Sequence, residues 1–345
     1  MRKKCQIVYG VPFLCLILVI WWNERLAFWW LAHQRWAQHN HNQEGADCDK
    51  ILLVADPQLI GYRNEKWGWV ARWDSDRYLA NGFDYAKRWF HPDSIIFLGD
   101  LFDEGLESND DHWAETYERF VANFPIEKHQ NVIYIAGDND IGGEQEFVSE
   151  TLRHKFANYF RNNITYLERF YSFSETFLLE RENEKVISKS KNAKKLDILL
   201  THVPYLEQSY KYSRVGDSKD LILSAHDHTV GIYEIQRSGP KAVLFTIVSD
   251  ASPIYVKTIG PGEPIIELKT PTCSYRMGVS SMGYGALTIC RSDQDPYRSI
   301  EIQYSVLWLP ARFAQFSLYV FTLLFCAGWI LVQRRSRTKR YSWLQ

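Results

Sequence analysis

Short apolar runs alternate with longer amphipathic segments through the middle of the chain. Five runs have the length and composition of strands buried in a sheet: 51–55, 94–98, 132–136, 196–201 and 221–225. Amphipathic segments that predict helices lie between the early runs, at about 74–90, 111–124 and 145–161. Because strands that alternate with helices form sheets with helical crossovers, we expect a mixed α/β domain with two sheets.

Two later segments, 171–180 and 231–237, show a different pattern. Their polar and apolar positions alternate, which is typical of antiparallel strands with one covered face. We therefore predict antiparallel pairing for both segments.

The two ends of the chain carry long apolar runs. Three basic residues precede the run 7–22, and the Trp and charged residues after it make a poor cleavage site, which favours a signal anchor over a cleaved signal peptide. The run 313–333 carries no charge and is followed by a basic stretch, which favours a membrane helix with a cytosolic end over a buried core helix. The predicted organisation is a cytosolic N-terminus and anchor helix at 1–32, a luminal domain at 46–305, a membrane helix at 311–333 and a basic cytosolic tail at 334–345.

Composition narrows the class of protein. The chain has 345 residues, 46% hydrophobic and 23% charged, with a net charge of −1, which indicates a folded protein without bulk attraction to nucleic acid. The glycosylation sequon Asn163-Ile164-Thr165 falls in the predicted luminal part and predicts a glycoprotein. Three luminal cysteines allow one disulfide among themselves; of the possible pairs of Cys48, Cys273 and Cys290, we favour Cys273–Cys290.

Metal-binding side chains follow each of the five predicted strands: Asp56, Asp100, Asp138, His202, and the pair His226 and His228. A single Asp after a strand is usually a turn residue or a helix cap. Ligands bind at the carboxyl ends of the strands in open α/β sheets, so five such positions in order predict one site. Carboxylates mixed with imidazoles suit Mn²⁺, Fe²⁺ or Zn²⁺, and a pair of such ions lowers the pKa of a shared water and holds the oxygens of a phosphate ester.

The order of these motifs resembles the calcineurin-like metallophosphoesterase superfamily, with its Asp-x-His, Gly-Asp-x-x-Asp, Gly-Asn-His-Asp, His and Gly-His-x-His motifs, over about residues 50–230. The stretches "GDLFDEG", "DIGGE" and "THVPY", with an apolar segment at each end, are similar to its membrane-anchored group. That group includes a yeast cell-division-control phosphoesterase and the enzyme that removes ethanolamine phosphate from GPI anchors. The resemblance implies a four-layer αββα sandwich of two mixed sheets and two divalent ions, with Mn²⁺ preferred over Fe²⁺ or Zn²⁺.

The resemblance also implies a role for each matching residue. One ion would be held by Asp56, Gln58, Asp100 and His228, and the other by Asp100, Asp138, His202 and His226. Asp103 would either support a ligand or cap the following helix. The candidates for catalytic roles are Asn139, Asp140 and His112.

The chain departs from the family pattern at four positions. Gln58 replaces a His, Ala225 replaces a Gly, and Asp138 replaces a metal-binding Asn. The added carboxylate should favour Mn²⁺ and make a shared water less acidic. Asn139 replaces the His that contacts the phosphate or protonates the leaving group, and His112 is the candidate substitute for a proton donor.

The expected function is a phosphodiesterase that removes ethanolamine phosphate from the GPI glycan and so aids the transport of GPI-anchored proteins. It would be a multi-pass protein of the endoplasmic reticulum or Golgi membrane with both termini cytosolic. Its partners would be the bilayer and the GPI glycolipid or GPI-anchored proteins, and no nucleic acid. Because of Asn139 and Gln58, a catalytically weakened metal-binding adaptor or cargo receptor remains an alternative, as does a phosphoesterase with another substrate.

Overall fold

The computed structural model describes residues 2–39, 46–63, 67–143, 147–176, 185–187, 195–206, 219–237, 243–246, 254–260, 262–292 and 300–342. The chain divides into two compact units. The larger unit spans 32–309, and the smaller unit combines 1–31 with 310–345.

The first sheet of the larger unit has six strands, in the order β10-β13-β12-β1-β2-β3. Their bounds are Tyr255–Ile259, Ile300–Trp308, Gly283–Ser292, Ala46–Val54, Ser94–Leu98 and Asn131–Ile135. β1, β2 and β3 are parallel neighbours, whereas β10, β12 and β13 pair in antiparallel fashion. The predicted strand 94–98 has these bounds in the structure. β3 is shifted by one residue from the predicted 132–136, and β1 begins five residues before the predicted 51–55 and ends one residue earlier.

The second sheet has seven strands, in the order β5-β4-β6-β7-β11-β8-β9. Their bounds are Lys185–Val186, Tyr171–Thr176, Leu196–Thr201, Leu221–Ser224, Ile265–Lys269, Gly231–Ile235 and Val243–Thr246. β8 pairs antiparallel with β11 and β9, which confirms the prediction for 231–237. The prediction for 171–180 is wrong for the contact with β6, which is parallel, while the pair with β5 is antiparallel. The alternation of polar and apolar residues indicates how well each face of a strand is covered, but it does not determine whether the neighbouring strand runs parallel or antiparallel. Residues 177–180 of the predicted segment lie outside the described part of the chain.

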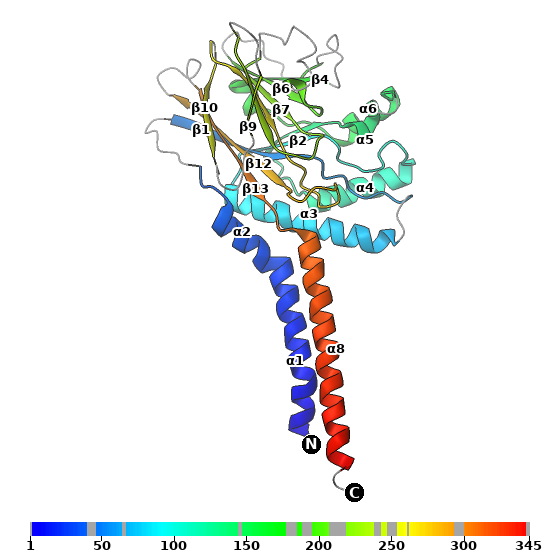
Figure 1. Cartoon of the computed structure of the whole chain (residues 1–345). Coiled ribbons are helices and arrows are strands. Elements are labelled where there is room, and N and C mark those ends of the chain that lie inside the picture. The colour runs from blue at the N-terminus through cyan, green and yellow to red at the C-terminus, as the bar shows by residue number, and fades with distance from the viewer. Residues whose placement is uncertain are drawn as a thin grey trace. The chain divides into compact units, whose positions relative to one another are not determined.

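The two sheets face each other across the main hydrophobic core, which contains Ile51, Leu53, Ile96 and Leu98 from the first sheet and Ile198, Leu200, Leu223 and Leu268 from the second. The alternate residues of the first sheet point outward, where α3 (Gly68–Phe90) and α4 (Asp110–Asn123) cover them (Figure 1). Phe97 of β2 packs against Phe83 of α3 and Phe120 of α4, with ring centroids 6.5 and 5.2 Å away. The expected pair of mixed sheets with flanking helices is confirmed.

Three shorter helical segments complete the larger unit: α5 (Asp138–Ile141), α6 (Glu150–Tyr159) and the 3-10 turn η2 (Leu167–Arg169). α6 is shorter than the predicted 145–161. The side chain of Asn109 caps α4 by accepting from the backbone N–H of His112 at 2.8 Å. The alternative role of Asp103 as the cap of that helix is therefore wrong.

The disulfide joins Cys48 to Cys290, so the predicted Cys273–Cys290 pair is wrong. Cys48 on β1 and Cys290 on β12 are directly opposite in an antiparallel pair, and their Cα atoms are 4.1 Å apart. Cys273 follows β11 and is a buried free thiol. Sheet register, which the spacing of cysteines along the chain does not reveal, selects the partner.

The smaller unit contains two long helical segments. α1 (Arg2–Trp21), the π-helical turn η1 (Trp22–Leu26) and α2 (Ala27–Arg35) form the first, and α8 (Arg312–Ser342) forms the second. Both are long and apolar enough to cross a membrane, at 9–35 and 312–335. Glu24 pairs with the buried Arg312 at 3.0 Å and accepts a hydrogen bond from Tyr319 at 2.7 Å, so polar contacts join the two segments where they pack together (Figure 1).

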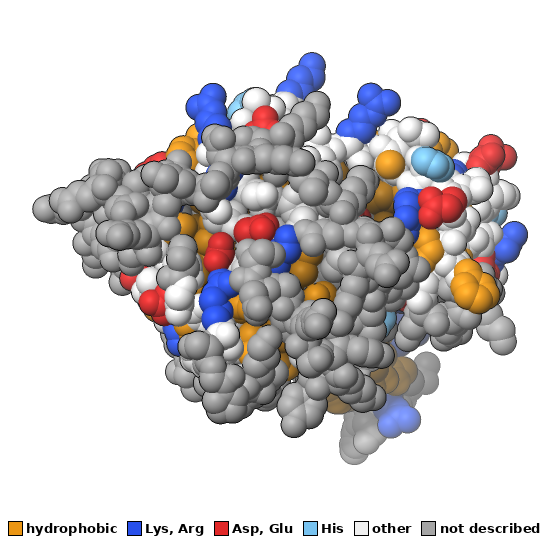
Figure 2. Space-filling view, turned by 90° about the horizontal axis from the view of Figure 1, so that it is seen from above, with side chains coloured by type: hydrophobic (Ala, Val, Ile, Leu, Met, Phe, Trp, Pro, Cys, Tyr) orange, Lys and Arg blue, Asp and Glu red, His pale blue; other side chains and the backbone are white. Residues whose placement is uncertain are grey.

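Acidic and basic side chains are interspersed over the described part of the surface in Figure 2. This distribution agrees with the net charge of −1. On that part of the surface the charges of both signs alternate over short distances, so their fields largely cancel over a few side-chain lengths.

Candidate metal centre

The predicted ligands lie at the carboxyl ends of parallel strands. Asp56 follows β1, Asp100 follows β2, and Asp138 begins α5 directly after β3. In the second sheet His202 follows β6 and the His226-Asp227-His228 turn follows β7. Since β1, β2 and β3 are parallel neighbours, and so are β6 and β7, each sheet delivers its polar side chains to one edge.

The backbone at these positions has an unusual conformation. Seven described non-glycine residues have positive φ, and five of them are predicted ligands: Asp56, Gln58, Asp100, His226 and His228, with φ between 39° and 72°. Positive φ costs free energy for residues with a Cβ, and such strain persists only where the surrounding structure enforces it. Its concentration at the strand ends indicates a functional site.

Glycine is required where the loops approach one another. Gly99 has a φ of 94°, and a Cβ on Gly137 would lie 2.1 Å from Oδ1 of Asp100. Ala225 stands where the family motif has Gly and has no positive φ, so its methyl group fits without strain.

The first group of converging side chains is Asp138, His202 and His226. Oδ1 of Asp138 lies 3.1 Å from both Nε2 of His202 and Nδ1 of His226, and the two ring nitrogens are 3.2 Å apart. Ligands that bind one cation at about 2.0–2.2 Å are separated by about 3.0–3.6 Å in octahedral or tetrahedral geometry. These three atoms therefore have the spacing of ligands to a common ion.

The second group shares Nε2 of His202 with Asp56 and Asp100, whose Oδ1 atoms lie 3.9 and 3.4 Å away. Asp56 is fully buried, and neither of its carboxylate oxygens has a hydrogen-bond partner among the described residues. A buried carboxylate without donors is costly unless a cation accompanies it. The donor set therefore fits divalent metal ions. Nε2 of His202 belongs to both groups but has one lone pair and can bind only one ion, so the bridging role of Asp100 stays a prediction.

Electrostatics of the centre follow from burial and crowding. The carbonyl oxygen of Leu98 lies 2.7 Å from Nδ1 of His202, so Nδ1 carries a hydrogen and Nε2 is the nitrogen that faces the carboxylates. Burial opposes a charge on His202, but Asp100, Asp138 and Asp56 outweigh it and raise its pKa. Nε2 therefore carries a hydrogen when no cation is bound and presents a lone pair when one is. Burial raises the pKa of Asp56 to about 8. Burial also opposes ionisation of Asp138, but hydrogen bonds from His202 and His226 outweigh it and lower its pKa. A cluster of this kind binds either protons or cations.

Sequence comparison identifies the family to which this geometry belongs. The family model of calcineurin-like phosphoesterases matches residues 49–230, more than half of the chain. The chain belongs to the calcineurin-like phosphoesterase family. Membership places it among metal-dependent phosphoesterases, which agrees with the Asp and His groups at the strand ends.

Three relatives illustrate the similarity. Cell division control protein 1 of Saccharomyces cerevisiae is 25% identical over 340 residues, covering 86% of this chain and 68% of that protein. The Metallophosphoesterase 1 homolog of Drosophila melanogaster is 26% identical over 129 residues, or 37% of this chain and 34% of the relative. Metallophosphoesterase 1 of Ailuropoda melanoleuca is 32% identical over 101 residues, which cover 29% of this chain and 25% of the relative. This chain thus matches only a quarter to a third of the last two relatives.

Both amide departures from the family pattern contact Asp100. Nδ2 of Asn139 donates to Oδ2 of Asp100 at 2.7 Å, and its backbone N–H donates to Oδ1 at 3.0 Å. Nε2 of Gln58 donates to the same Oδ2 at 2.9 Å and lies 3.3 Å from Nε2 of His228. Gln58 thus presents its amide nitrogen to the centre, where a metal ligand would present the oxygen.

The remaining candidates lie behind or beside the centre. Asp140 is fully buried, and its carboxylate accepts from the backbone N–H groups of Leu101, Phe102 and Gly137, which gives it a position that supports the loops. His112 stacks on Tyr62 with ring centroids 4.7 Å apart. Asp103 lies 3.7 Å from Arg276.

Two charged residues of β11 were missed by the sequence reasoning. Glu267 is fully buried and accepts from the backbone N–H groups of Tyr205 and Leu206, in the loop after His202. Lys269 is also buried and donates to Asp227 at 2.8 Å, in the turn between His226 and His228. The signal was two charged residues within the otherwise apolar stretch "IIELK", since buried charges are rarely found without a partner.

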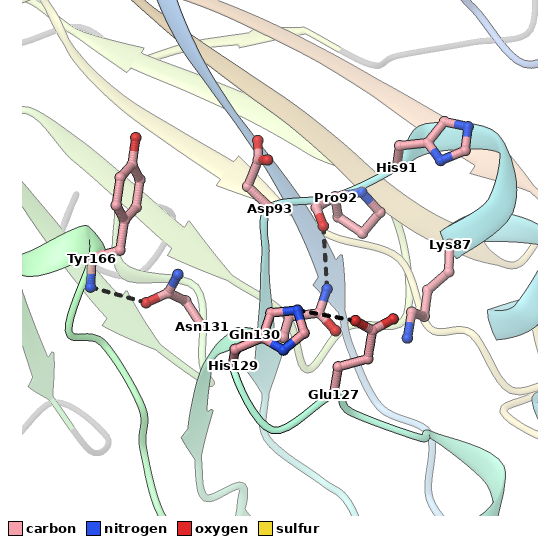
Figure 3. A pocket seen from close by; sticks show the side chains of 9 residues that line it. All are labelled: Lys87, His91, Pro92, Asp93, Glu127, His129, Gln130, Asn131 and Tyr166. Atoms are coloured by element: carbon pink, nitrogen blue, oxygen red, sulfur yellow. Dashed lines mark hydrogen bonds and ion pairs between the residues drawn. The ribbon is translucent and has the colours of Figure 1, made fainter.

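A cavity of about 460 Å³ lies at the opposite ends of the parallel strands. Figure 3 shows its lining between the start of β2, the start of β3 and the end of α3, with Glu127 paired to His129 and Gln130 bonded to Pro92. Asp93 and Asn131, at the amino ends of β2 and β3, line this cavity, whereas Asp100 and Asp138 follow the carboxyl ends. The cavity is therefore separate from the metal centre.

Proposed function

We propose that the protein is a metal-dependent phosphodiesterase that removes ethanolamine phosphate from the GPI glycan in the secretory pathway. The observation that carries the proposal is the pair of overlapping Asp and His groups, one of which includes Asp56, a carboxylate without a hydrogen-bond donor among the described residues. Divalent cations bound there would supply a water of lowered pKa and hold the oxygens of the phosphate ester. The surrounding structure that enforces positive φ at the predicted ligands also holds their side chains in place before a substrate binds.

The side chains divide the work as their contacts indicate. Asp56, Asp100, Asp138, His202 and His226 would hold the cations, and the Nδ1–H of His202, bound to the Leu98 carbonyl, fixes its ring. Asn139 positions Asp100 and has no proton to release near neutral pH.

Hydrolysis by the full-length protein tests this proposal. We expect protein in detergent with Mn²⁺ to release phosphoethanolamine from a GPI glycolipid and to cleave a soluble phosphodiester. Chelation or Asp56→Asn should abolish both activities, whereas Asp84→Asn, on the outer part of α3, should not. Mn²⁺ binding without hydrolysis of any diester would contradict the enzyme proposal.

A second candidate function is a metal-binding adaptor or cargo receptor with weakened catalysis. The specific observation in its favour is that Asn139 occupies the position of the family's proton donor and is bonded to Asp100. Capture of GPI-anchored proteins from solubilised membranes by the Asp56→Asn variant as well as the wild type would favour this function.

We also propose a multi-pass topology in the endoplasmic reticulum or Golgi membrane, with both termini cytosolic. The two candidate spans and the sequon support it. One N–H of Asn163 donates to the carbonyl oxygen of Gln130 at 3.1 Å, and a glycosylated asparagine retains one N–H for this bond. Glycosidase treatment should increase the electrophoretic mobility of the wild type but not of Thr165→Ala; equal mobility before and after treatment contradicts a luminal domain with a glycan.

A further inference from the structure

Three tryptophan side chains at the start of α3 are directed to solvent. Trp67, Trp69 and Trp73 are 77%, 69% and 59% exposed, and Val70 is 37% exposed. Together they present on the order of 400 Å² of apolar surface, the size of the largest apolar patches on monomeric proteins, which are often functional. Trp67 has a φ of 62°, a conformation that bulky residues rarely adopt. We call these four residues the tryptophan face.

α3 also lies beside both points at which the chain leaves the larger unit. On the N-terminal side, the rings of His33 and Trp36 pack edge-on against Trp89 at 4.9 and 6.2 Å. On the C-terminal side, a Cβ added to Gly82 would lie 3.1 Å from Cδ2 of Leu309. The two candidate spans, 9–35 and 312–335, adjoin these contacts. Within the larger unit, α3 therefore contacts the residues next to both attachment points.

The tryptophan face is joined to the loop of the metal centre. Arg72, which lies between Trp69 and Trp73 in the sequence, donates to the carbonyl oxygen of Gly61 at 2.9 Å, three residues beyond Gln58. The guanidinium of Arg72 also lies over the ring of Tyr62 at 4.1 Å. The start of α3 and the loop after β1 are therefore one packed assembly, and whatever the tryptophan face binds is held near the metal centre.

We propose that the tryptophan face docks into the headgroup layer of the membrane in which the chain is anchored. Tryptophan is enriched at membrane–water interfaces, because its ring is apolar and its N–H finds polar partners there. The guanidinium of Arg77 lies over the ring of Trp73 at 4.1 Å and pairs with Asp74 at 3.2 Å, so this ion pair holds the ring in place without adding net charge. Docking holds the metal centre against the bilayer, so its substrate is a phosphodiester carried by a lipid; this last step rests on the proposed function.

Photo-crosslinking to lipid tests the docking independently of catalysis. The wild-type full chain is reconstituted in phosphatidylcholine vesicles that contain a phosphatidylcholine with a diazirine near its headgroup, and adducts are mapped on tryptic peptides. We expect adducts on Trp67–Arg72 and Trp73–Arg77, as on α8, and none on the peptide that carries the exposed Val256 of β10. Labelling of α8 without labelling of 67–77 overturns the proposal, and so does labelling of the Val256 peptide to the same extent as 67–77.

A kinetic comparison tests the consequence for the substrate. In Trp69→Ser/Trp73→Ser, the ratio of turnover on a vesicle-embedded diester to turnover on a soluble diester should fall about tenfold, since an aromatic side chain contributes at least that factor when buried. Val256→Ser, which also removes an exposed apolar side chain, should keep the wild-type ratio. An unchanged ratio in the double variant overturns the role in substrate access. A wild type that cleaves neither diester contradicts the proposed function, and the crosslinking result then still decides the docking.

Discussion

The Asp140→Asn substitution separates a supporting role of Asp140 from a catalytic one. One oxygen of its buried carboxylate, Oδ2, accepts from Leu101 at 3.1 Å and Gly137 at 2.9 Å, and Oδ1 accepts from Phe102 at 3.0 Å. Asparagine keeps the shape but turns one acceptor into an NH₂ group. The smallest loss occurs when this group replaces Oδ1, which leaves only the N–H of Phe102 without its partner.

The size of the effect follows from that single bond. A hydrogen bond to a charged group contributes about 1.5–3 kcal/mol. Burial raises the pKa of Asp140 to about 7, so keeping it ionised offsets part of the gain from three donors. We therefore use the loss of one hydrogen bond, about 2 kcal/mol, as the expected cost. In a unit of this size that loss lowers the melting temperature by about 3 °C.

Thermal unfolding of the full chain in detergent, combined with Mn²⁺ titration, measures both consequences. We expect a lower melting temperature and weaker Mn²⁺ binding, because the three donors belong to the loops of Asp100 and Asp138. The control is Asp84→Asn, which removes a partly exposed ion pair with Arg88 and should change stability by less than about 0.5 kcal/mol. A variant that matches this control in both measurements but loses turnover refutes the supporting role.

Four further substitutions probe neighbouring parts of the centre. Asn139→His should raise turnover about 10²-fold or more on a diester with an alcohol leaving group, but much less on a p-nitrophenyl diester, whose leaving group needs no proton; equal gains contradict a proton-donor role. Gln58→His should tighten Mn²⁺ binding in calorimetry, because a ring nitrogen can bind metal where the amide N–H cannot. Lys269→Met should weaken Mn²⁺ binding about 10-fold, because Asp227 loses the hydrogen bond that holds the turn of His226 and His228. Lys269→Arg should restore the binding. Burial raises the pKa of Glu267 in the folded protein. The protonated side chain therefore contributes its full stability below the ordinary glutamate pKa, and this contribution is lost as the pH rises through the pKa of the folded protein. Thermal unfolding of Glu267→Gln should not show this decrease in stability with rising pH.

The strands that build the centre could be predicted because each is buried on both faces. The continuous apolar runs of β2 and β6 mark them without knowledge of their partners, and their carboxyl ends locate Asp100 and His202. β12 and β13 were not predicted; each mixes polar residues with apolar ones over nine or ten positions, and their place beside β1 depends on long-range pairing.

Side-chain direction was the second limit of prediction. Asp138 and Asp140 are two residues apart in one motif, yet the first faces the two histidines and the second faces backbone N–H groups. The four-residue helix α5 turns them apart, and nothing in the spacing of the motif distinguishes them. The same limit explains Cys290, whose partner is set by the register of β1 against β12.

The departures from the family pattern affect one half of the centre and spare the other. Gln58 and Asn139 both donate to Oδ2 of Asp100, so their N–H groups occupy lone pairs of Asp100 that a cation would use. Gln58 also lies 3.3 Å from Nε2 of His228. Within the described part of the chain no side-chain amide donates to Asp138, His202 or His226, and these three keep the spacing of ligands to one ion. Binding of at least one metal ion is therefore expected of an enzyme and of an adaptor alike. The enzyme and the adaptor differ in what the surroundings of Asp100 allow, namely whether a second ion binds there and whether another group supplies the proton that Asn139 cannot.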